Sequence, residues 1–232
     1  MLKHLISHPA SLLPQAASGH LGWLRGAIGA GLAICVSGLL TLVLMGGGSA
    51  GLPILVAPLG ASAVLVFAVP ASPLAQPWSV IGGDLISATI GLAIGHWLGA
   101  PVLSAGLAVG IAIAVMSVAR CLHPPGGACA LLCALGASGT EAWGMGYLVP
   151  IAINVLSLAI AGWLYNNLTG HPWPHRVKVL HSPASTETDW THDDLEAVLA
   201  EWNEVVDVDA NELEAIFQAL QRRVKARNSQ GM

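Results

Sequence analysis

Apolar residues along this chain come in long, nearly unbroken runs, unlike the alternating pattern of a strand or the one-sided stripe of a soluble helix. Four of the runs hold about 20 residues, roughly what an α-helix needs to cross the ~30 Å hydrocarbon core of a bilayer. These runs lie at about 23–45, 78–98, 101–119 and 145–168. The pattern therefore predicts an all-α membrane protein.

Two shorter apolar segments lie between these runs, and prolines break both of them. In the segment 52–69, about twelve residues remain after Pro58, or ~18 Å of helix at about 1.5 Å per residue. The pair Pro124 and Pro125 cannot lie inside a helix, but it suits the first turn of a new one that runs to about residue 138. We therefore expect about six membrane segments, two of which are short helices that begin at a break.

The two halves of the apolar region resemble each other at a shift of 66 residues. Identical residues pair at this shift across two helices and the loop between them: Pro58 with Pro124, Gly60 with Gly126, and Trp97 with Trp163. Chance agreement among sequences rich in Ala, Gly and Leu is the alternative. We predict two repeats of three segments, at about 23–98 and 101–168. Because three is an odd number, the repeats enter the membrane from opposite sides, as in many secondary transporters.

Composition supports a membrane domain with a polar tail. Of the 232 residues, 54% are hydrophobic and 9% are charged, against roughly 25% charged residues in an average soluble domain. Eleven of the 13 Asp and Glu residues follow residue 184, and basic clusters of the kind that bind nucleic acid are missing from the apolar region. The predicted parts are an N-terminal lead at 1–22, a transmembrane domain at 23–170, a linker at 171–190 and a cytoplasmic hairpin of two amphipathic helices at 191–227.

The distribution of charge predicts the orientation of the chain. With six crossings and a cytoplasmic N-terminus, five basic residues fall on the cytoplasmic side: Lys3, Arg25, Arg120, Arg176 and Lys178. Glu141 then falls on the opposite side, which agrees with the positive-inside rule. We expect a multi-pass protein of the bacterial inner membrane with both termini in the cytoplasm. The lipid bilayer is its expected partner, nucleic acid and cofactors are not expected, and a homo-oligomer is left open.

The two proline breaks define the candidate substrate site. In inverted repeats the N-termini of the two short helices point toward the middle of the membrane, and such ends attract anions through unpaired N–H groups and the helix dipole. Glycine lets backbone amides approach a ligand, a hydroxyl adds a hydrogen bond, and Arg or His adds charge. The residues assigned to this site are Pro58, Gly60, Ser62, Arg120, His123, Pro124, Pro125, Gly126 and Gly127. Close helix packing is the alternative role for the glycines, and a cytoplasmic topology anchor is the alternative for Arg120.

Asp84 and Asn154 are the polar residues assigned to proton coupling or to a cavity. Asp84 is the one carboxylate inside the apolar runs, and an acid at membrane depth is costly and often carries a proton. Its alternative roles are an ion pair or a helix N-cap. Asn154 aligns by the repeat with Ala88, one turn from Asp84, so we expect the two to face one cavity.

The cysteines allow one further hypothesis. Cys121, Cys129 and Cys133 lie close to His123 in the sequence, and together these four side chains suit a soft metal ion. Packing of small apolar thiols is the preferred interpretation.

The segment Arg120-Cys-Leu-His-Pro-Pro-Gly-Gly-Ala128 resembles the signature of the HPP family of integral membrane proteins. Two further segments, Pro58-Leu-Gly-Ala-Ser62 and Ser72-Pro-Leu-Ala-Gln-Pro77, match in the family's order. The resemblance implies a polytopic membrane protein suspected of transport, with plant chloroplast and cyanobacterial relatives linked to nitrite. The family is usually described with four spanning helices, and many bacterial relatives carry C-terminal CBS domains that this sequence lacks.

These observations lead to one functional hypothesis and two alternatives. We expect a secondary transporter or channel for a small inorganic anion, with nitrite as the candidate that the resemblance implies and with proton coupling at Asp84. A membrane-embedded enzyme that uses His123 and Asp84 as acid and base is the first alternative, and an enzyme is not expected because the sequence shows no motif of known catalytic spacing. A scaffold that does not transport is the second.

Overall fold

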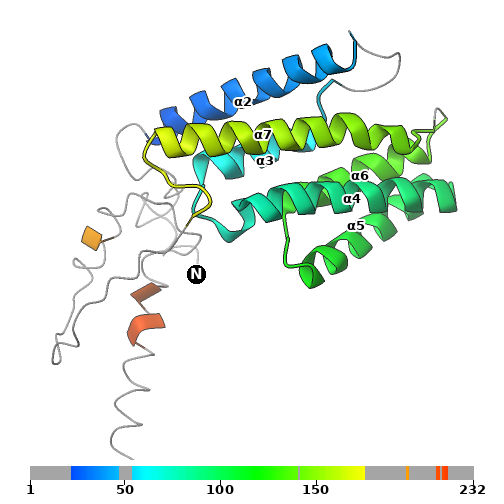
Figure 1. Cartoon of the computed structure of the whole chain (residues 1–232). Coiled ribbons are helices and arrows are strands. Elements are labelled where there is room, and N and C mark those ends of the chain that lie inside the picture. Colours follow the sequence, from blue (N-terminus) through cyan, green and yellow to red (C-terminus); the bar gives the residue numbers. More distant parts are fainter. Residues whose placement is uncertain are drawn as a thin grey trace, which may run out of the picture. The chain divides into compact units, whose positions relative to one another are not determined.

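The computed structural model describes residues 22–46, 54–140 and 142–175, together with 197–198, 213–214 and 216–218. Residues 24–177 form one compact unit. Its elements are α2 (Gly22–Leu44), α3 (Pro58–Ala68), the 3-10 turn η2 (Pro73–Ala75), α4 (Pro77–Leu98), α5 (Pro101–Val118), α6 (Pro124–Ala137), the 3-10 turn η3 (Met145–Tyr147) and α7 (Leu148–Leu168) (Figure 1). The predicted lead at 1–22 and hairpin at 191–227 lie almost wholly outside the described residues.

The predicted all-α membrane fold is confirmed. Four helices are long and apolar enough to cross a membrane, namely α2, α4, α5 and the stretch Met145–Leu168, which includes η3 and α7. The two short helices, α3 with 11 residues and α6 with 14, begin at the predicted prolines. The order of one long, one short and one long helix therefore occurs twice. The relation of the halves by an inverted repeat and the side on which the termini lie stay predictions.

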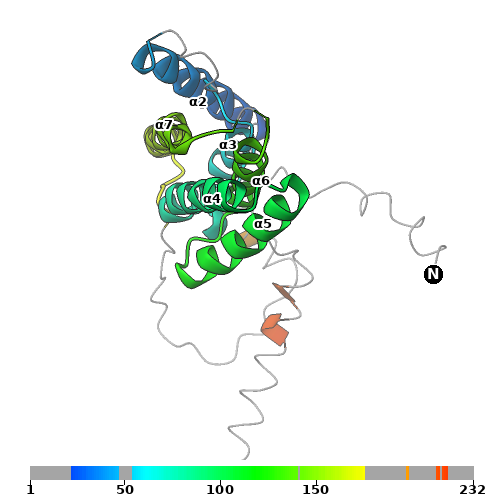
Figure 2. The same ribbon diagram turned by 90° about the vertical axis from the view of Figure 1, so that its right-hand side faces the viewer.

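The helices pack around α4, which contacts α5, α6 and α7. Figure 1 shows α2 on one side of the bundle and α5 on the other, and Figure 2 shows the same order nearly end-on. The outer faces of α2 and α5 are apolar and exposed, with Leu32 at 56% and Val102 at 88%. Apolar surface on this scale suits contact with lipid rather than water.

Small residues hold α4 and α6 together. A Cβ added to Gly91 of α4 would clash with the backbone carbonyl of Ala130 in α6. A Cβ added to Gly126 of α6 would lie 2.8 Å from the carbonyl oxygen of Gly83 in α4. The two backbones are therefore in direct contact. Such close approach is how membrane helices associate where lipid removes the hydrophobic driving force between them.

Side chains from α2 and α7 satisfy the C-terminal end of α3. Arg25 Nη2 donates to the carbonyl of Phe67 at 2.8 Å, and Asn166 Nδ2 donates to the carbonyl of Val66 at 2.9 Å. Arg25 Nη1 also donates to Asn166 Oδ1 at 2.9 Å. A short helix that ends inside a membrane protein needs such partners for its last carbonyls, and a cation there also complements the helix dipole.

Candidate functional site

Three polar side chains from three different elements meet in the interior of the bundle. Ser62 Oγ of α3 lies 3.0 Å from Asp84 Oδ2 of α4 and 2.9 Å from His123 Nε2 at the start of α6. The direct distance from His123 Nε2 to Asp84 Oδ2 is 3.8 Å. All three residues are fully buried. We call this group the Asp84–Ser62–His123 cluster.

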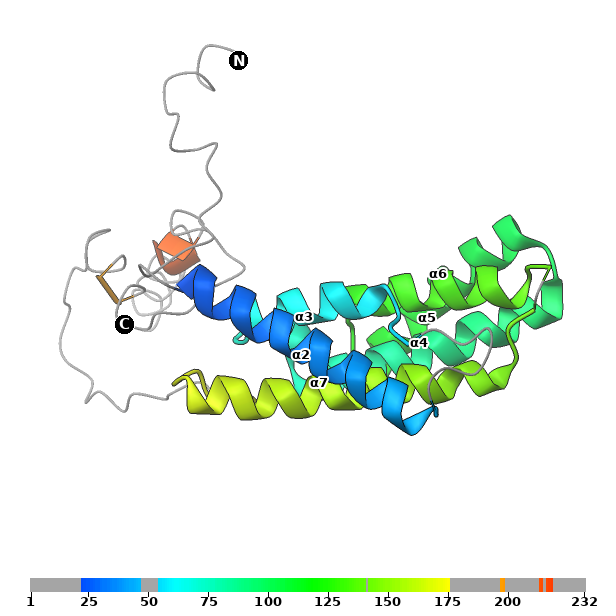
Figure 3. The ribbon, with the colours of Figure 1, turned by 90° about the horizontal axis from the view of Figure 1, so that it is seen from above.

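The two broken helices bring Ser62 and His123 together. Ser62 lies one turn after Pro58, and His123 is the N-cap of α6, held in an extended conformation as expected for a residue before proline. Figure 3 shows α3 and α6 in line with each other, and the hydrogen bond joins the N-terminal part of one to the N-terminus of the other.

Asp84 lies well inside α4 rather than at its start. The helix begins at Pro77 and its N-cap is Gln76, so the N-cap alternative for Asp84 is wrong. One carboxyl oxygen, Oδ2, is bonded to Ser62, whereas Oδ1 is buried without a hydrogen-bond partner among the described residues. The thiol of Cys129 in α6 interacts with the same carboxyl group. The acid is thus held inside the protein with few partners for a full negative charge.

A backbone carbonyl orients the imidazole. His123 Nδ1 lies 2.8 Å from the carbonyl oxygen of Leu74 in η2. A carbonyl oxygen only accepts hydrogen bonds, so Nδ1 carries a hydrogen and Nε2 faces Ser62. Sequence reasoning missed this contact because it joins residues 49 positions apart through a main-chain atom.

The prediction of unpaired backbone N–H groups in the first turns of α3 and α6 is wrong. Pro58, Pro124 and Pro125 have no N–H to offer. The next amides are already bonded three residues back: Leu59 to Val56, Gly60 to Ala57, and Gly126 to His123, at 3.0, 3.1 and 2.9 Å. What the two ends contribute at the cluster is therefore their dipoles and the side chains of Ser62 and His123, rather than a cradle of free amides.

The other predicted site residues are scattered. Gly60 is exposed and Gly127 half-buried, with no atom near an added Cβ, whereas Gly126 packs against α4. Pro58 and Pro125 are buried and Pro124 is exposed. Arg120 is exposed at the end of α5. The structure thus brings Ser62, Asp84 and His123 together and leaves Arg120 and Gly60 outside the cluster.

Asn154 belongs to a separate set of contacts. Its Nδ2 donates to Thr41 Oγ1 at 2.7 Å and to the carbonyl of Ile54 at 3.0 Å, and its Oδ1 accepts from the N–H of Val56 at 3.1 Å. These bonds hold the non-helical segment that leads into α3. We expected Asn154 and Asp84 to face one cavity. None of these hydrogen bonds of Asn154 reaches Asp84, and the Asn154 amide group is fully hydrogen-bonded to other residues.

The segment His171–His175 folds back onto η2. The buried ring of Trp173 donates from Nε1 to the carbonyl of Ala75 at 2.9 Å, and the N–H of His175 donates to Gln76 Oε1 at 2.8 Å. The linker predicted at 171–190 therefore begins with residues that pack against the bundle. Ala75 follows Leu74, whose carbonyl orients His123. The bond from Trp173 to Ala75 therefore helps to hold the Leu74 carbonyl in place beside the cluster.

Replacing Trp173 by phenylalanine should destabilise the protein by about 1–2 kcal/mol, because the buried carbonyl of Ala75 loses its donor. Thermal unfolding in detergent measures the loss. Trp163→Phe is the matched control, since Trp163 is 56% exposed. Equal behaviour of the two variants would show that Trp173 has no supporting role.

Arg120 has an unusual backbone conformation for its residue type. Its φ of 53° is left-handed, and the next N–H, of Cys121, bonds to the carbonyl of Met116 at 2.9 Å to close α5. Glycine normally occupies this position, because a side chain there costs roughly 1 kcal/mol. Gly99 holds a similar φ of 62° at the end of α4.

Arg120→Gly should therefore stabilise the protein by about 0.5–1 kcal/mol. Denaturant unfolding in detergent is the measurement, and Gly99→Ala should shift stability in the opposite direction. A folded Arg120→Gly protein that is no more stable than the wild type would show that contacts of the Arg120 side chain offset the cost of its left-handed backbone.

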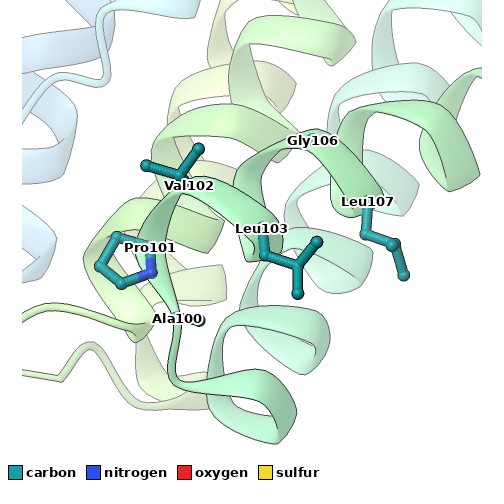
Figure 4. A pocket seen from close by; sticks show the side chains of 6 residues that line it. All are labelled: Ala100, Pro101, Val102, Leu103, Gly106 and Leu107. Atoms are coloured by element: carbon teal, nitrogen blue, oxygen red, sulfur yellow. The ribbon is translucent and has the colours of Figure 1, made fainter.

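A surface hollow of about 610 Å³ lies at the start of α5, lined by Ala100, Pro101, Val102, Leu103, Gly106 and Leu107 (Figure 4). Its lining is apolar and includes no member of the cluster. Among the described residues no three His, Cys, Asp or Glu side chains are placed to hold a metal ion, so the soft-metal hypothesis lacks a ligand set there. The cluster is the chemically distinctive feature of the described interior.

The fold and the cluster define a multi-pass α-helical membrane protein with ionisable groups buried where two broken helices meet. The model of the HPP transmembrane region matches residues 15–174, which is more than half of the chain. The chain belongs to the HPP family.

Two curated relatives are transmembrane proteins of Dictyostelium discoideum. One is 39% identical over 113 residues, which cover 46% of this chain and 36% of the relative. The other is 36% identical over 124 residues, which cover 51% of this chain and 43% of the relative. The chain thus spans less than half the length of these relatives. No solved structure matches it significantly.

Proposed function

We propose that this protein is a secondary transporter that couples the movement of a proton to that of a small inorganic anion, with nitrite as the first substrate to test. The observation that carries the proposal is the buried Asp84–Ser62–His123 cluster at the meeting point of α3 and α6. Broken helices that meet inside a membrane protein mark the substrate site in many transporters. Ionisable groups at that depth are typical of proton pathways.

The charges of the site favour a proton together with an anion. Each helix N-terminus carries about half a positive charge, and the N-terminal parts of α3 and α6 both face the cluster. A proton added to His123 makes the site more positive, so an anion that enters with the proton removes the excess charge. The bilayer surrounds this site in the proposal, with both chain termini in the cytoplasm of a bacterial cell and the protein in its inner membrane.

One observation favours a second candidate, a membrane-embedded hydrolase. Ser62 Oγ and His123 Nε2 are 2.9 Å apart, the separation of a serine nucleophile and its general base. Against this role, Asp84 also bonds to the serine, and a carboxylate beside the nucleophile repels the oxyanion of an acyl transfer reaction. Labelling of Ser62 by a fluorophosphonate probe, and its loss in His123→Gln, would support the hydrolase over the transporter.

Uptake by proteoliposomes tests the transporter directly. We expect nitrite to enter vesicles that contain the protein faster than protein-free vesicles, and we expect a pH gradient, acidic outside, to drive accumulation. Nitrous acid crosses bilayers unaided, so protein-free vesicles under the same pH gradient give the background rate that is subtracted. No protein-dependent uptake of nitrite or of nitrate, chloride and formate would leave the scaffold as the better explanation.

A further inference from the structure

We infer that the Asp84–Ser62–His123 cluster holds one shared proton, and that the Ser62 hydroxyl passes this proton between the carboxyl group and the imidazole. The role of this proton in transport rests on the proposed function. The shared proton itself needs no substrate, because it follows from which atoms face one another and how many hydrogens they carry.

The contact with Leu74 fixes the tautomer of His123. Leu74 offers only a carbonyl oxygen to Nδ1, at 2.8 Å, so Nδ1 keeps its hydrogen in both the neutral and the charged ring. The atom whose protonation changes is therefore Nε2, which lies 2.9 Å from Ser62 Oγ.

The Ser62 hydroxyl has a single hydrogen, but it has two hydrogen-bond neighbours in the cluster. If Asp84 were ionised and His123 neutral, Asp84 Oδ2 at 3.0 Å and His123 Nε2 at 2.9 Å would both require that hydrogen. The acceptor that does not receive the hydrogen would then face a lone pair of Ser62 Oγ at hydrogen-bond distance, with no hydrogen between the two atoms. A buried acceptor left in this way loses its hydration without compensation, and here a full negative charge would be buried as well.

No cationic side chain among the described residues offsets that carboxylate, and the N-termini of α3 and α6 supply only partial positive charge. Among the described residues the Lys and Arg side chains are Arg25 and Arg120. Arg25 is bonded at the opposite end of α3, to the carbonyl of Phe67, and Arg120 is exposed. The thiol of Cys129 faces the carboxyl from α6. A proton is therefore the available source of compensating charge.

One added proton supplies a hydrogen for both contacts of Ser62 Oγ, to Asp84 Oδ2 and to His123 Nε2, in either of two arrangements. In the first, Asp84 Oδ2–H donates to Ser62 Oγ, and the Ser62 hydroxyl donates to His123 Nε2. In the second, His123 Nε2–H donates to Ser62 Oγ, and the hydroxyl donates to Asp84 Oδ2. Both forms are neutral overall, either as an acid with a neutral ring or as a carboxylate with an imidazolium.

The two forms interconvert without any other reactant. The O–H bond of Asp84 breaks as its proton binds Ser62 Oγ, and the former hydroxyl hydrogen of Ser62 moves to His123 Nε2. The serine ends as it began, and the proton has in effect crossed from the α4 side to the α6 side of the cluster. The direct distance of 3.8 Å between Nε2 and Oδ2 is too long for this transfer without the hydroxyl.

A second proton is disfavoured by charge. It leaves a net positive charge beside the N-terminal ends of two helices, where the dipoles oppose it. It also turns the Ser62 hydroxyl toward its one remaining acceptor, the carbonyl of Pro58, at the longer distance of 3.4 Å. One proton is thus the resting occupancy of the cluster.

Titration with protons tests the inference on the full chain in lipid nanodiscs. Infrared difference spectroscopy reports the protonated carboxyl of Asp84, and NMR of nitrogen-15 histidine reports the two ring nitrogens of His123. The spectra of Asp84→Asn and His123→Gln assign the signals. We expect Nδ1 to stay protonated throughout, and the carboxyl and imidazolium signals to vanish together at one midpoint as the pH rises, with a combined loss of one proton.

Ser62→Ala should separate the two groups, so that Asp84 and His123 titrate at different midpoints, and should slow proton-driven uptake by about a hundredfold. Ser62→Thr keeps the hydroxyl and should titrate as the wild type does. Separate midpoints in the wild type, an unprotonated Nδ1, or an unchanged titration in folded Ser62→Ala would each overturn the inference. The wild-type titration decides even if the alanine variant does not fold.

The shared proton and the proposed transport function can be rejected independently of each other. A shared midpoint without proton-driven uptake of any anion would leave the shared proton in place and reject the transporter. Proton-driven uptake with separate midpoints would keep the transporter and reject the relay through Ser62.

Discussion

Gly126→Val should prevent α4 and α6 from packing and should lower the free energy of unfolding by about 3 kcal/mol or more. The added Cβ alone would lie 2.8 Å from the carbonyl oxygen of Gly83, 2.9 Å from Ser87 Oγ and 3.0 Å from Met116 Sδ. A backbone carbonyl cannot move aside as a flexible side chain does, so the helices must separate. Thermal unfolding in detergent and the yield of monodisperse protein measure the loss.

Gly127→Val is the matched control, one residue further along the same helix. A Cβ on Gly127 meets no atom within 4 Å, and the same is true of Gly60 in α3. Both of these valine variants should fold with nearly wild-type stability. A stable Gly126→Val protein that fails in uptake would instead support a glycine that contacts the substrate, and loss of uptake in folded Gly60→Val would do the same for α3.

Asp84→Asn should abolish the accumulation that a pH gradient drives and leave the fold intact. Asparagine keeps the size of the side chain, and its amide N–H donates to Ser62 as the protonated acid does, so the variant imitates one protonation state permanently. Replacement of a buried ionisable acid by a neutral amide should leave stability unchanged or raise it by about 1–3 kcal/mol, because a neutral group costs less to bury. Uptake with and without a pH gradient, measured beside thermal unfolding, separates the two effects.

Ser87→Ala provides the control for that experiment. Ser87 is also buried in α4, three residues after Asp84, and its hydroxyl donates to Met116 Sδ at 3.4 Å rather than to the cluster. This variant should keep its response to the pH gradient. An Asp84→Asn protein with an unchanged response would assign Asp84 a structural role.

The helix boundaries could be predicted from sequence because the signals are local. The helices α3 and α6 begin at Pro58 and Pro124 as expected, since proline lacks the N–H that a helix interior needs. Asp84 was recognisable as a site residue for a similar reason, because an acid inside an apolar run has a cost that does not depend on its neighbours.

The sequence singled out Ser62, Asp84 and His123 as candidate site residues, but it could not show that they contact one another, because these contacts join distant parts of the chain. Ser62 and His123 are 61 positions apart, and the carbonyl of Leu74 that orients the imidazole carries no side-chain signal. Arg120 stood out in the signature by its charge, yet it is exposed after the end of α5, whereas His123, three residues further on, is buried and enters the cluster.

The sequence does contain a local pattern that distinguishes the packed Gly126 from the unpacked Gly127. Gly126, Ala130 and Ala134 recur every four residues on one face of α6, a spacing typical of helices in backbone contact. Gly127 lies off that face. This spacing alone favours helix packing over ligand contact as the role of Gly126.

The unequal attachment of the two short helices has a consequence for how the protein opens. The helix α6 is interlocked with α4 through main-chain atoms at Gly83 and Gly126, and such a contact cannot be exchanged for another without separating the pair. The helix α3 is held by buried side chains and by side-chain hydrogen bonds: Ser62 bonds within the cluster, Arg25 donates to the carbonyl of Phe67, and Asn154 accepts from the N–H of Val56. Such contacts can be replaced one at a time. We therefore expect α3 to shift its position more readily than the α4–α6 pair.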